Sequence, residues 1–193
     1  MNTLKSITKW TGAALACVLF FSSTTWAQSS SKLTDPEIAS VAVTANQIDV
    51  NYGKIALRKS KNKEIRKFAE TMIKDHTDII KQAVALATRL HVTPKTNATT
   101  KSLLDGEKST TKTLDSKRGK AFDEAYIDNE VAYHKAVINA VQNVLIPDAT
   151  NQDLKDLLTK VMPLLNSHLE MAENTQAEIQ GKKVSANTGG SSW

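Results

Sequence analysis

Four stretches of the chain carry apolar residues at steps of three and four, the spacing that places side chains on one face of a helix. The first runs over about 34–55, and the others run over about 62–91, 117–145 and 151–179. The first stretch opens with Thr34-Asp35-Pro36-Glu37, a capping box with proline in the first turn. Strand patterns are absent from the sequence, so the pattern predicts an all-α protein.

Polar segments separate these helices. Residues 147–150 form a short turn, whereas residues 93–113 are rich in Thr, Ser and Lys, with a short helical piece around Leu103 and Leu104. We expect 93–113 to be the most mobile folded segment. Pro163 should kink or break the last helix. Two short-turn helix pairs with a longer connection between the second and third helices indicate a ferritin-like antiparallel four-helix bundle, and a plain up-down bundle is the alternative.

The N-terminus has the three parts of a secretory signal peptide. Lys5 and Lys9 are followed by an apolar run over 10–21 and by small residues up to Ala27. The run is about 12 residues long, too short to span a bilayer. We therefore expect cleavage after Ala27 and export to the periplasm.

A lipoprotein cleavage site at Cys17 is the alternative reading of this segment. The apolar run continues past Cys17, which places the cysteine inside the core of the signal. It is the only cysteine of the chain, so a chain cleaved after Ala27 has no thiol and forms no disulfide.

Charge and composition limit the classes of partner that the chain can bind. The formal charge is +5, and removal of Lys5 and Lys9 leaves +3. Aromatic residues are few and no basic tract interleaves with them, which argues against nucleic-acid binding. No later segment is apolar enough to cross a membrane. We expect one bundle domain over 28–180 and a disordered tail over 181–193.

Three of the four histidines lie on the apolar stripes of three different predicted helices: His76, His134 and His168. Each is near the middle of its helix, so antiparallel packing should bring the three side chains together in the core. His91, at the end of the second helix, is expected on the surface.

Acidic residues accompany these histidines. Glu130 precedes His134 by four and shares its face, Asp123 lies one or two turns earlier, and Asp49 flanks the first stripe. Asp75 adjoins His76 but points about 100° away from it. Around a turn near residue 148, His168 lies about five residues further out than His134, so Glu130 is expected to bridge the two.

Buried imidazoles need partners, because unpaired polar groups in a core are costly. A divalent metal such as zinc, iron or manganese is one solution, with His76, His134, His168, Glu130 and Asp49 as the candidate ligands. A hydrogen-bonded network without metal is the other.

Several motifs at these positions resemble one family of bacterial exported proteins. They are the segment 48–56, Asp-His at 75–76, Phe-Asp-x-x-Tyr at 122–126 with His134 after it, and Pro-x-x-x-x-His at 163–168. The family is labelled as predicted outer-membrane proteins with a domain of unknown function, family 4142, and is placed among ferritin-like folds. The resemblance covers about 35–175 and implies fold and compartment but no activity. The family usually has Glu where this chain has Asp49.

The ferritin-like di-iron pattern is incomplete here. It requires one Glu from each of two helices and Glu-x-x-His from each of the other two. Asp49 and Glu130 match the single carboxylates, but Ile73 and Leu165 occupy the motif glutamate positions before His76 and His168. The sequence therefore favours a mononuclear site over a di-iron oxidase.

No nucleophile arrangement, phosphate loop or complete metal motif is present. The sequence predicts an exported periplasmic or envelope bundle that acts as a non-enzymatic binding or stress-related module. The family resemblance implies association with the outer membrane. A ferritin-like protein with a mononuclear His/carboxylate metal site is the alternative. The oligomeric state is not determined by the sequence.

Overall fold

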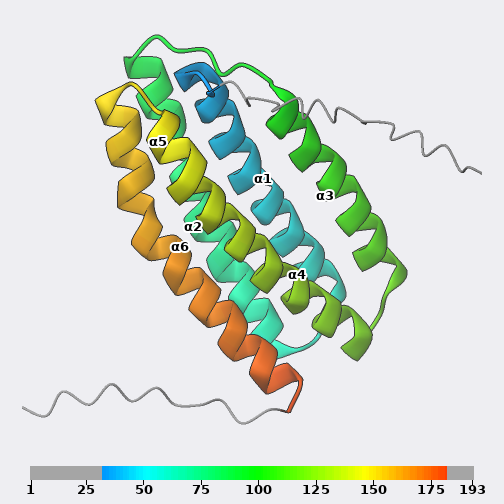
Figure 1. The fold of residues 1–193 in the computed structure, drawn as a ribbon. Helices are drawn as coiled ribbons and strands as arrows, with labels where there is room; N and C mark the ends of the chain where they lie inside the picture. The colour runs from blue at the N-terminus through cyan, green and yellow to red at the C-terminus, as the bar shows by residue number, and fades with distance from the viewer. Residues whose placement is uncertain (1–31, 182–193) are drawn as a thin grey trace, which may run out of the picture. The chain divides into compact units, whose positions relative to one another are not determined.

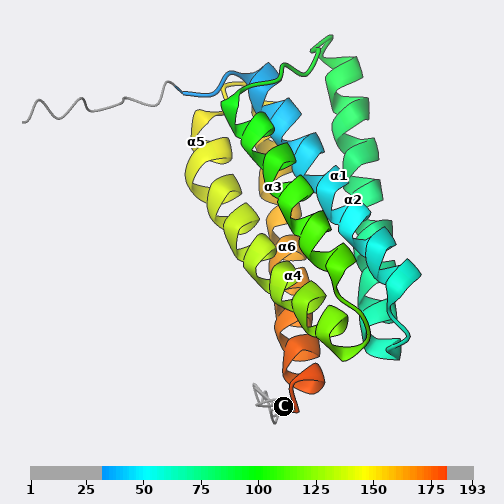
Figure 2. The same ribbon diagram turned by 90° about the vertical axis from the view of Figure 1, so that its right-hand side faces the viewer.

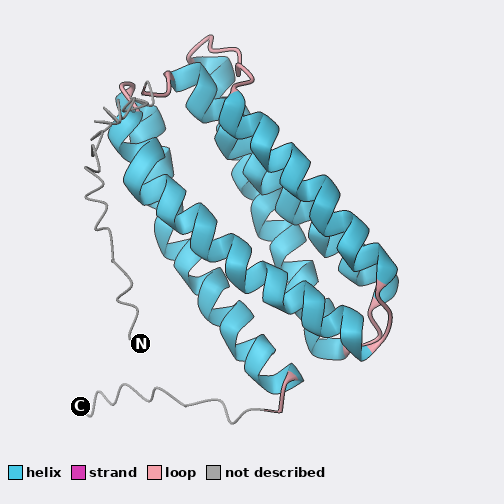
Figure 3. Ribbon diagram, turned by 45° about the vertical axis from the view of Figure 1, so that its right-hand side comes forward, coloured by secondary structure: helices cyan, strands magenta, loops and turns pink. Residues whose placement is uncertain are grey.

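The computed structural model describes residues 32–181, so the expected signal peptide over 1–27 and the expected tail beyond residue 181 lie outside the described residues. The described chain consists of helices and loops and contains no strand (Figure 3). This confirms the all-α prediction.

The structure contains five long helices, a π-helical turn called η1 and one short helix (Figure 1). They are α1 (Asp35–Lys59), α2 (Lys63–Arg89), α3 (Ala98–Ser116), α4 (Lys120–Ala140), η1 (Val141–Leu145), α5 (Ile146–Asp148) and α6 (Gln152–Ile179). None of the helices in this part of the chain is apolar over the length that a membrane crossing requires.

The helices begin where the sequence places capping residues. At the start of α1, the Thr34 backbone N–H and hydroxyl both donate to the Glu37 carboxylate, at 3.0 and 2.7 Å. Asn62 and Asn151 accept backbone N–H groups of the first turns of α2 and α6. These bonds satisfy donors that have no partner within the helix. Pro163 lies inside α6, and the helix continues through it.

The longer connection between α2 and α4 is present, but most of it is helical. The sequence predicts a polar connection over 93–113 with a short helical piece around Leu103 and Leu104, whereas α3 has 19 residues and begins after the cap Asn97. Leu114 is buried, and the Lys59 ammonium on α1 donates to its carbonyl oxygen at 2.9 Å. Figure 2 shows α3 lying alongside α1 and α4. Residues 32–181 thus contain five long helices where four are predicted. The ferritin-like assignment and the mobility of this segment stay predictions.

Buried apolar residues form two clusters, one toward each end of the helices. Along α1 the first cluster includes Ile48 and Tyr52, and the second includes Ile38 and Val41. On α2, α4 and α6 the histidines lie between the members of the two clusters, for example between Met72 and Leu86 on α2. The core is therefore two apolar layers with a polar layer between them.

Gly53 lets α1 approach α2 closely. A Cβ atom at this position would lie 2.8 Å from Ile73 Cγ1 and 3.1 Å from the Ala69 carbonyl oxygen. These atoms belong to a β-branched side chain and to the backbone, and neither moves easily. Any larger residue at 53 would push the two helices apart.

We expect Gly53→Ala to destabilise the protein and Gly106→Ala to stabilise it. Gly106 also lies inside a helix, but a Cβ there meets no atom within 4 Å. Alanine at 106 should gain about 1 kcal/mol of helix propensity, whereas overpacking at 53 should cost about 1–3 kcal/mol. Urea unfolding of both variants measures the difference. Equal stabilisation by the two substitutions would show that α1 and α2 separate freely.

Candidate metal centre

The polar layer contains two carboxyl groups and three imidazoles from four helices. Asp49 comes from α1, His76 from α2, Glu130 and His134 from α4, and His168 from α6, and each is at most 3% exposed. The ring centroids lie 5.0 Å apart for His76 and His168 and 5.6 Å apart for the other two pairs. The structure therefore brings all five predicted site residues into one interior cluster.

Asp49 lies between two of the histidines. Its Oδ2 atom is 3.4 Å from His76 Nε2 and 3.6 Å from His134 Nε2. Glu130 contacts one histidine, with Oε2 at 3.7 Å from His134 Nδ1. The three histidines and the group of Asp49, Glu130 and His134 each hold one ligand atom per residue within 4.8 Å of one another. His134 belongs to both groups.

One nitrogen of His76 and one of His134 are held from outside the cluster. His76 Nδ1 lies 2.7 Å from Asn46 Oδ1, and Asn46 Nδ2 donates to the Ala42 carbonyl at 2.8 Å, so Asn46 Oδ1 is the acceptor. His134 Nδ1 donates to the Glu130 backbone carbonyl at 2.9 Å. Both acceptors fix the proton on Nδ1 and leave the lone pair on Nε2.

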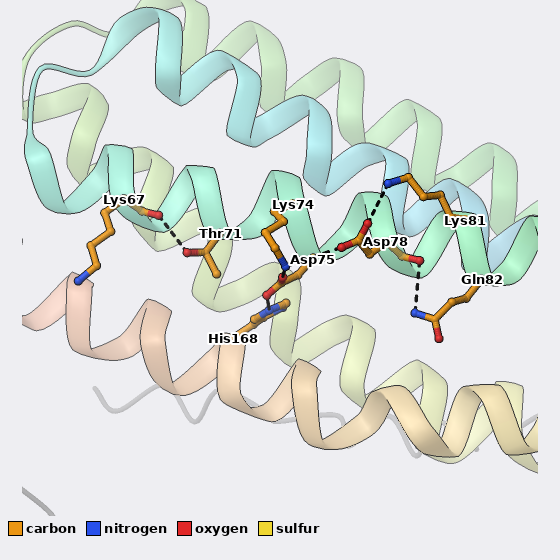
Figure 4. A network of polar contacts seen from close by, with 8 residues as sticks. All are labelled: Lys67, Thr71, Lys74, Asp75, Asp78, Lys81, Gln82 and His168. Atoms are coloured by element: carbon orange, nitrogen blue, oxygen red, sulfur yellow. Dashed lines mark hydrogen bonds and ion pairs between the residues drawn. The ribbon is translucent and has the colours of Figure 1, made fainter.

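His168 is oriented from α2 by Asp75. His168 Nε2 lies 3.1 Å from Asp75 Oδ2, and Lys74 contacts Asp75 Oδ1 at 3.0 Å (Figure 4). Burial raises the pKa of Asp75, but the hydrogen bonds from Lys74 and His168 outweigh it and hold the pKa below its ordinary value. An ionised Asp75 accepts a hydrogen bond from the Nε2–H group of His168, so the lone pair of this imidazole is on Nδ1.

The remaining nitrogens have no hydrogen-bond partner among the described residues. They are His76 Nε2, His134 Nε2 and His168 Nδ1, and both carboxylate oxygens of Asp49 and of Glu130 are likewise without one. Unsatisfied buried polar atoms are rare in folded proteins and each requires an explanation. Three imidazole lone pairs and two carboxyl groups in one place form a set of metal-ligand atoms.

Burial shifts the titration of these groups toward their neutral forms. It raises the pKa of Asp49 to about 8. It also raises the pKa of Glu130 well above its ordinary value, with the charge of Asp49 adding to the effect. Burial lowers the pKa of His76 to about 2, helped by the neighbouring His134 and His168, and it lowers the pKa of His134 to about 4. Without a cation, the cluster is therefore neutral at pH 7.

Family comparison places the chain in one group of proteins. A family model described as a domain of unknown function, DUF4142, matches residues 22–175. The chain belongs to the DUF4142 family. No match was found among the curated proteins.

A solved structure shares the fold. The structure described as CopM in the Cu(II)-bound form is similar with a TM-score of 0.57 and 13% sequence identity, and the match covers 76% of this chain and 98% of that one. At this identity the likeness concerns the arrangement of the helices alone.

Two features of this DUF4142 site differ from the sequence-based expectation. Glu130 is expected to bridge His134 and His168, but those rings are direct neighbours, and the carboxyl group found between two histidines is that of Asp49. Asp123 is buried away from the cluster and lines a separate pocket together with Arg58 and Arg118.

Sequence reasoning missed the roles of Asn46 and Asp75 as partners of the imidazoles. Asn46 precedes Asp49 by three and so shares its face of α1, a signal that could have indicated it. Asp75 was placed at the edge of its helix face, and only the position of α6 shows that it meets His168. His91 is exposed, as predicted, with a positive φ of 53° beyond the end of α2.

In the metal-free protein, stability should fall as the pH rises from 7 to 8. The folded pKa values of Asp49 and Glu130 are raised, so the folded state holds protons that the unfolded chain has already released, and this stabilisation is lost as pH approaches the folded pKa. The histidines do not contribute here, because they are uncharged in both states above their ordinary pKa. We expect the titration of Asp49 to lower the free energy of unfolding by about 1 kcal/mol, and the titration of Glu130 to lower it further.

Urea unfolding in the presence of a chelator measures this decrease. Asp49→Asn is the matched control and should make this decrease smaller, with the remainder due to Glu130. A parent protein whose stability is constant over this range would mean that Asp49 and Glu130 are both already ionised in the folded state, paired with charged histidines.

Proposed function

We propose that this protein binds a divalent transition-metal ion through His76, His134, His168 and Asp49, with Glu130 as an adjoining carboxylate. The observation that carries the proposal is that the two nitrogens of each imidazole have different surroundings. One nitrogen donates to a fixed acceptor, and the other has no partner among the described residues. Histidine ligands of metals have this arrangement, because the outer hydrogen bond sets the tautomer and the ring orientation.

The distances support coordination of one ion. Ligands at about 2.0–2.1 Å from a tetrahedral zinc lie about 3.3 Å from one another. Asp49 Oδ2 is 3.4 Å from His76 Nε2 and 3.6 Å from His134 Nε2, close to that spacing. One ring nitrogen from each of the three histidines lies within 4.8 Å of the others, so the three side chains must move inward to coordinate a common ion.

Charge favours one ion over two. Asp49 and Glu130, once ionised, offset the two positive charges of a single divalent cation. A second cation would leave two charges without compensation in a buried site, which is costly. The hypothesis of a mononuclear site therefore agrees better with this ligand set than a dinuclear one does.

Copper and zinc are the ions to test first. A site dominated by imidazole suits copper, zinc, iron and nickel, and affinity for a given site is usually highest for Cu(II). The similar structure of CopM in its Cu(II)-bound form adds support for copper. Manganese and iron, the other ions considered from the sequence, serve as comparisons.

The proposed role is to hold the ion rather than to catalyse a reaction with it. The sequence has no catalytic motif, and the ligands come from four helices packed around a buried layer. Together with the expected signal peptide, this suggests an exported metal-binding module of the cell envelope. Association with the outer membrane remains part of the same proposal.

Metal titration tests the site. Isothermal calorimetry with Zn(II), and with Cu(II) held by a weak competing chelator, should give one ion per chain. Alanine at His76, His134 or His168 should lower the affinity by more than 100-fold, and Asp75→Ala, which removes only the outer hydrogen bond, should lower it by about 10–100-fold. His91→Ala is the matched control, because His91 is exposed and lies outside the cluster, and should bind as the parent does.

Thermal unfolding tests whether the histidines act as one unit. Bound metal should raise the melting temperature of the parent and leave a His76/His134 double alanine variant unchanged. The two single substitutions should be non-additive in the metal-bound protein. A parent that binds neither ion, with additive histidine effects, would leave a hydrogen-bonded network in a structural bundle.

Export is tested separately. Mass spectrometry of the protein recovered from the native cell envelope should give an N-terminus at or near Gln28. An intact N-terminus in the cytoplasmic fraction would contradict the signal peptide without bearing on the metal site.

A further inference from the structure

A cavity of about 310 Å³ lies beside the metal centre, between α1, α4 and α3. Its walls are almost entirely apolar and include Val41, Ala45, Ile79, Leu103, Val137 and Val141. Val141 and Leu145 both belong to the π-helical turn η1, are buried, and line this cavity. π turns are frequent at functional sites. An apolar hollow of this size is larger than a cation needs.

The polar end of the cavity is the proposed metal centre itself. Asp49, His76 and His134 line it, together with Asn46, whose carbonyl oxygen accepts from His76. His76 Nε2 is buried and has no hydrogen-bond partner among the described residues. No lysine or arginine is among the residues that line the cavity. A ligand in it would thus have an apolar body and meet hydrogen-bond acceptors at one end.

Access is from the side where α3 covers the space between α1 and α4. Thr99 on α3 and Ala136 on α4 are lining residues that are also exposed to solvent, so they mark the mouth. α3 is held in this region by a few polar contacts, among them the 3.2 Å contact between the Thr100 and Ser40 hydroxyls. A small molecule can therefore reach the interior without separation of α1 from α2 or of α4 from α6.

The volume sets the size of the ligand. An apolar cavity of about 150 Å³ holds benzene. This cavity is about twice as large, which corresponds to roughly twelve non-hydrogen atoms. Ligand pockets generally have apolar walls and a small number of polar groups that fix the orientation, and this cavity has that composition.

We propose that the cavity binds a small, uncharged, apolar molecule that carries one hydroxyl group at its end, with the hydroxyl directed at His76 and Asp49. In the metal-free protein the hydroxyl donates to His76 Nε2. In the metal-bound protein its oxygen lies beside the ion, which deepens the proposed metal-binding function of the same site. A carboxylate head is disfavoured in the metal-free protein, because it would lose its hydration in an apolar cavity that no cationic side chain lines.

Fluorescence titration with 1-naphthol and naphthalene tests this proposal on the purified protein, once metal-free and once loaded with zinc. We expect saturable binding of one 1-naphthol per chain in the metal-free protein, about five- to tenfold tighter than naphthalene because of the buried hydrogen bond. His76→Phe keeps a ring at this position but removes the acceptor, and it should abolish the preference for 1-naphthol.

Two variants that fill the cavity locate the binding. Ala140→Leu and Ala42→Leu each place a larger side chain in the cavity wall and should weaken 1-naphthol binding at least tenfold. Ala132→Leu is the matched control, because Ala132 lies two turns earlier on α4, is exposed and does not line the cavity. It should bind 1-naphthol as the parent does.

Three results would overturn the proposal: no saturable binding in either metal state, unchanged binding in both filled variants, or equal affinity for naphthalene and 1-naphthol. Zinc titration without 1-naphthol separates this failure from failure of the metal site. Intact zinc binding without 1-naphthol binding would refute only the proposed cavity ligand. Binding of 1-naphthol without zinc binding would refute only the proposed metal site.

Discussion

The structure depends on the burial of five ionisable side chains at one level of the helices. Asp49, His76, Glu130, His134 and His168 are each almost fully buried, and apolar clusters lie on both sides of them. Burial of so many polar groups in a core is costly unless each finds a partner. The outer hydrogen bonds satisfy only one nitrogen of each histidine, and the inward atoms are left to one another or to a cation.

The direction of side chains on antiparallel helices explains how His134 and His168 meet. The turn between their helices is formed by residues 149–151, so His134 lies 16 residues before its centre and His168 lies 18 residues after it. Helical side chains lean toward the N-terminus of their own helix. His134 therefore leans away from the turn and His168 leans toward it, and the two rings close the difference of about 3 Å.

The sequence predicted the parts of the fold that follow from helical periodicity. The stripes containing His76, His134 and His168 placed these residues in the core. The helix starts predicted near residues 62 and 151 agree with the observed caps Asn62 and Asn151. The length of α3 was underestimated, because its sequence is rich in Thr, Ser and Lys and has only two buried residues. Its helix is fixed by the cap at Asn97 and by packing on α1, and local periodicity does not report such tertiary contacts. The roles of Asn46 and Asp75 were missed for the same reason, since they depend on which helices become neighbours.

The cavity and the polar layer have a common origin in the small residues of α1 and α4. The cavity wall contains four alanines, Ala42 and Ala45 on α1 and Ala136 and Ala140 on α4. Their side chains are too short to fill the space between the two helices. The side chains that line this hollow make fewer van der Waals contacts than they would in a close-packed core, which costs packing energy. Leucine at these positions would recover part of that energy, but it would also cover His76 and Asp49. The small residues therefore open a path from the solvent to the buried ligand atoms, at the cost of packing contacts. An occupant with an apolar body would restore the contacts that the alanines do not make.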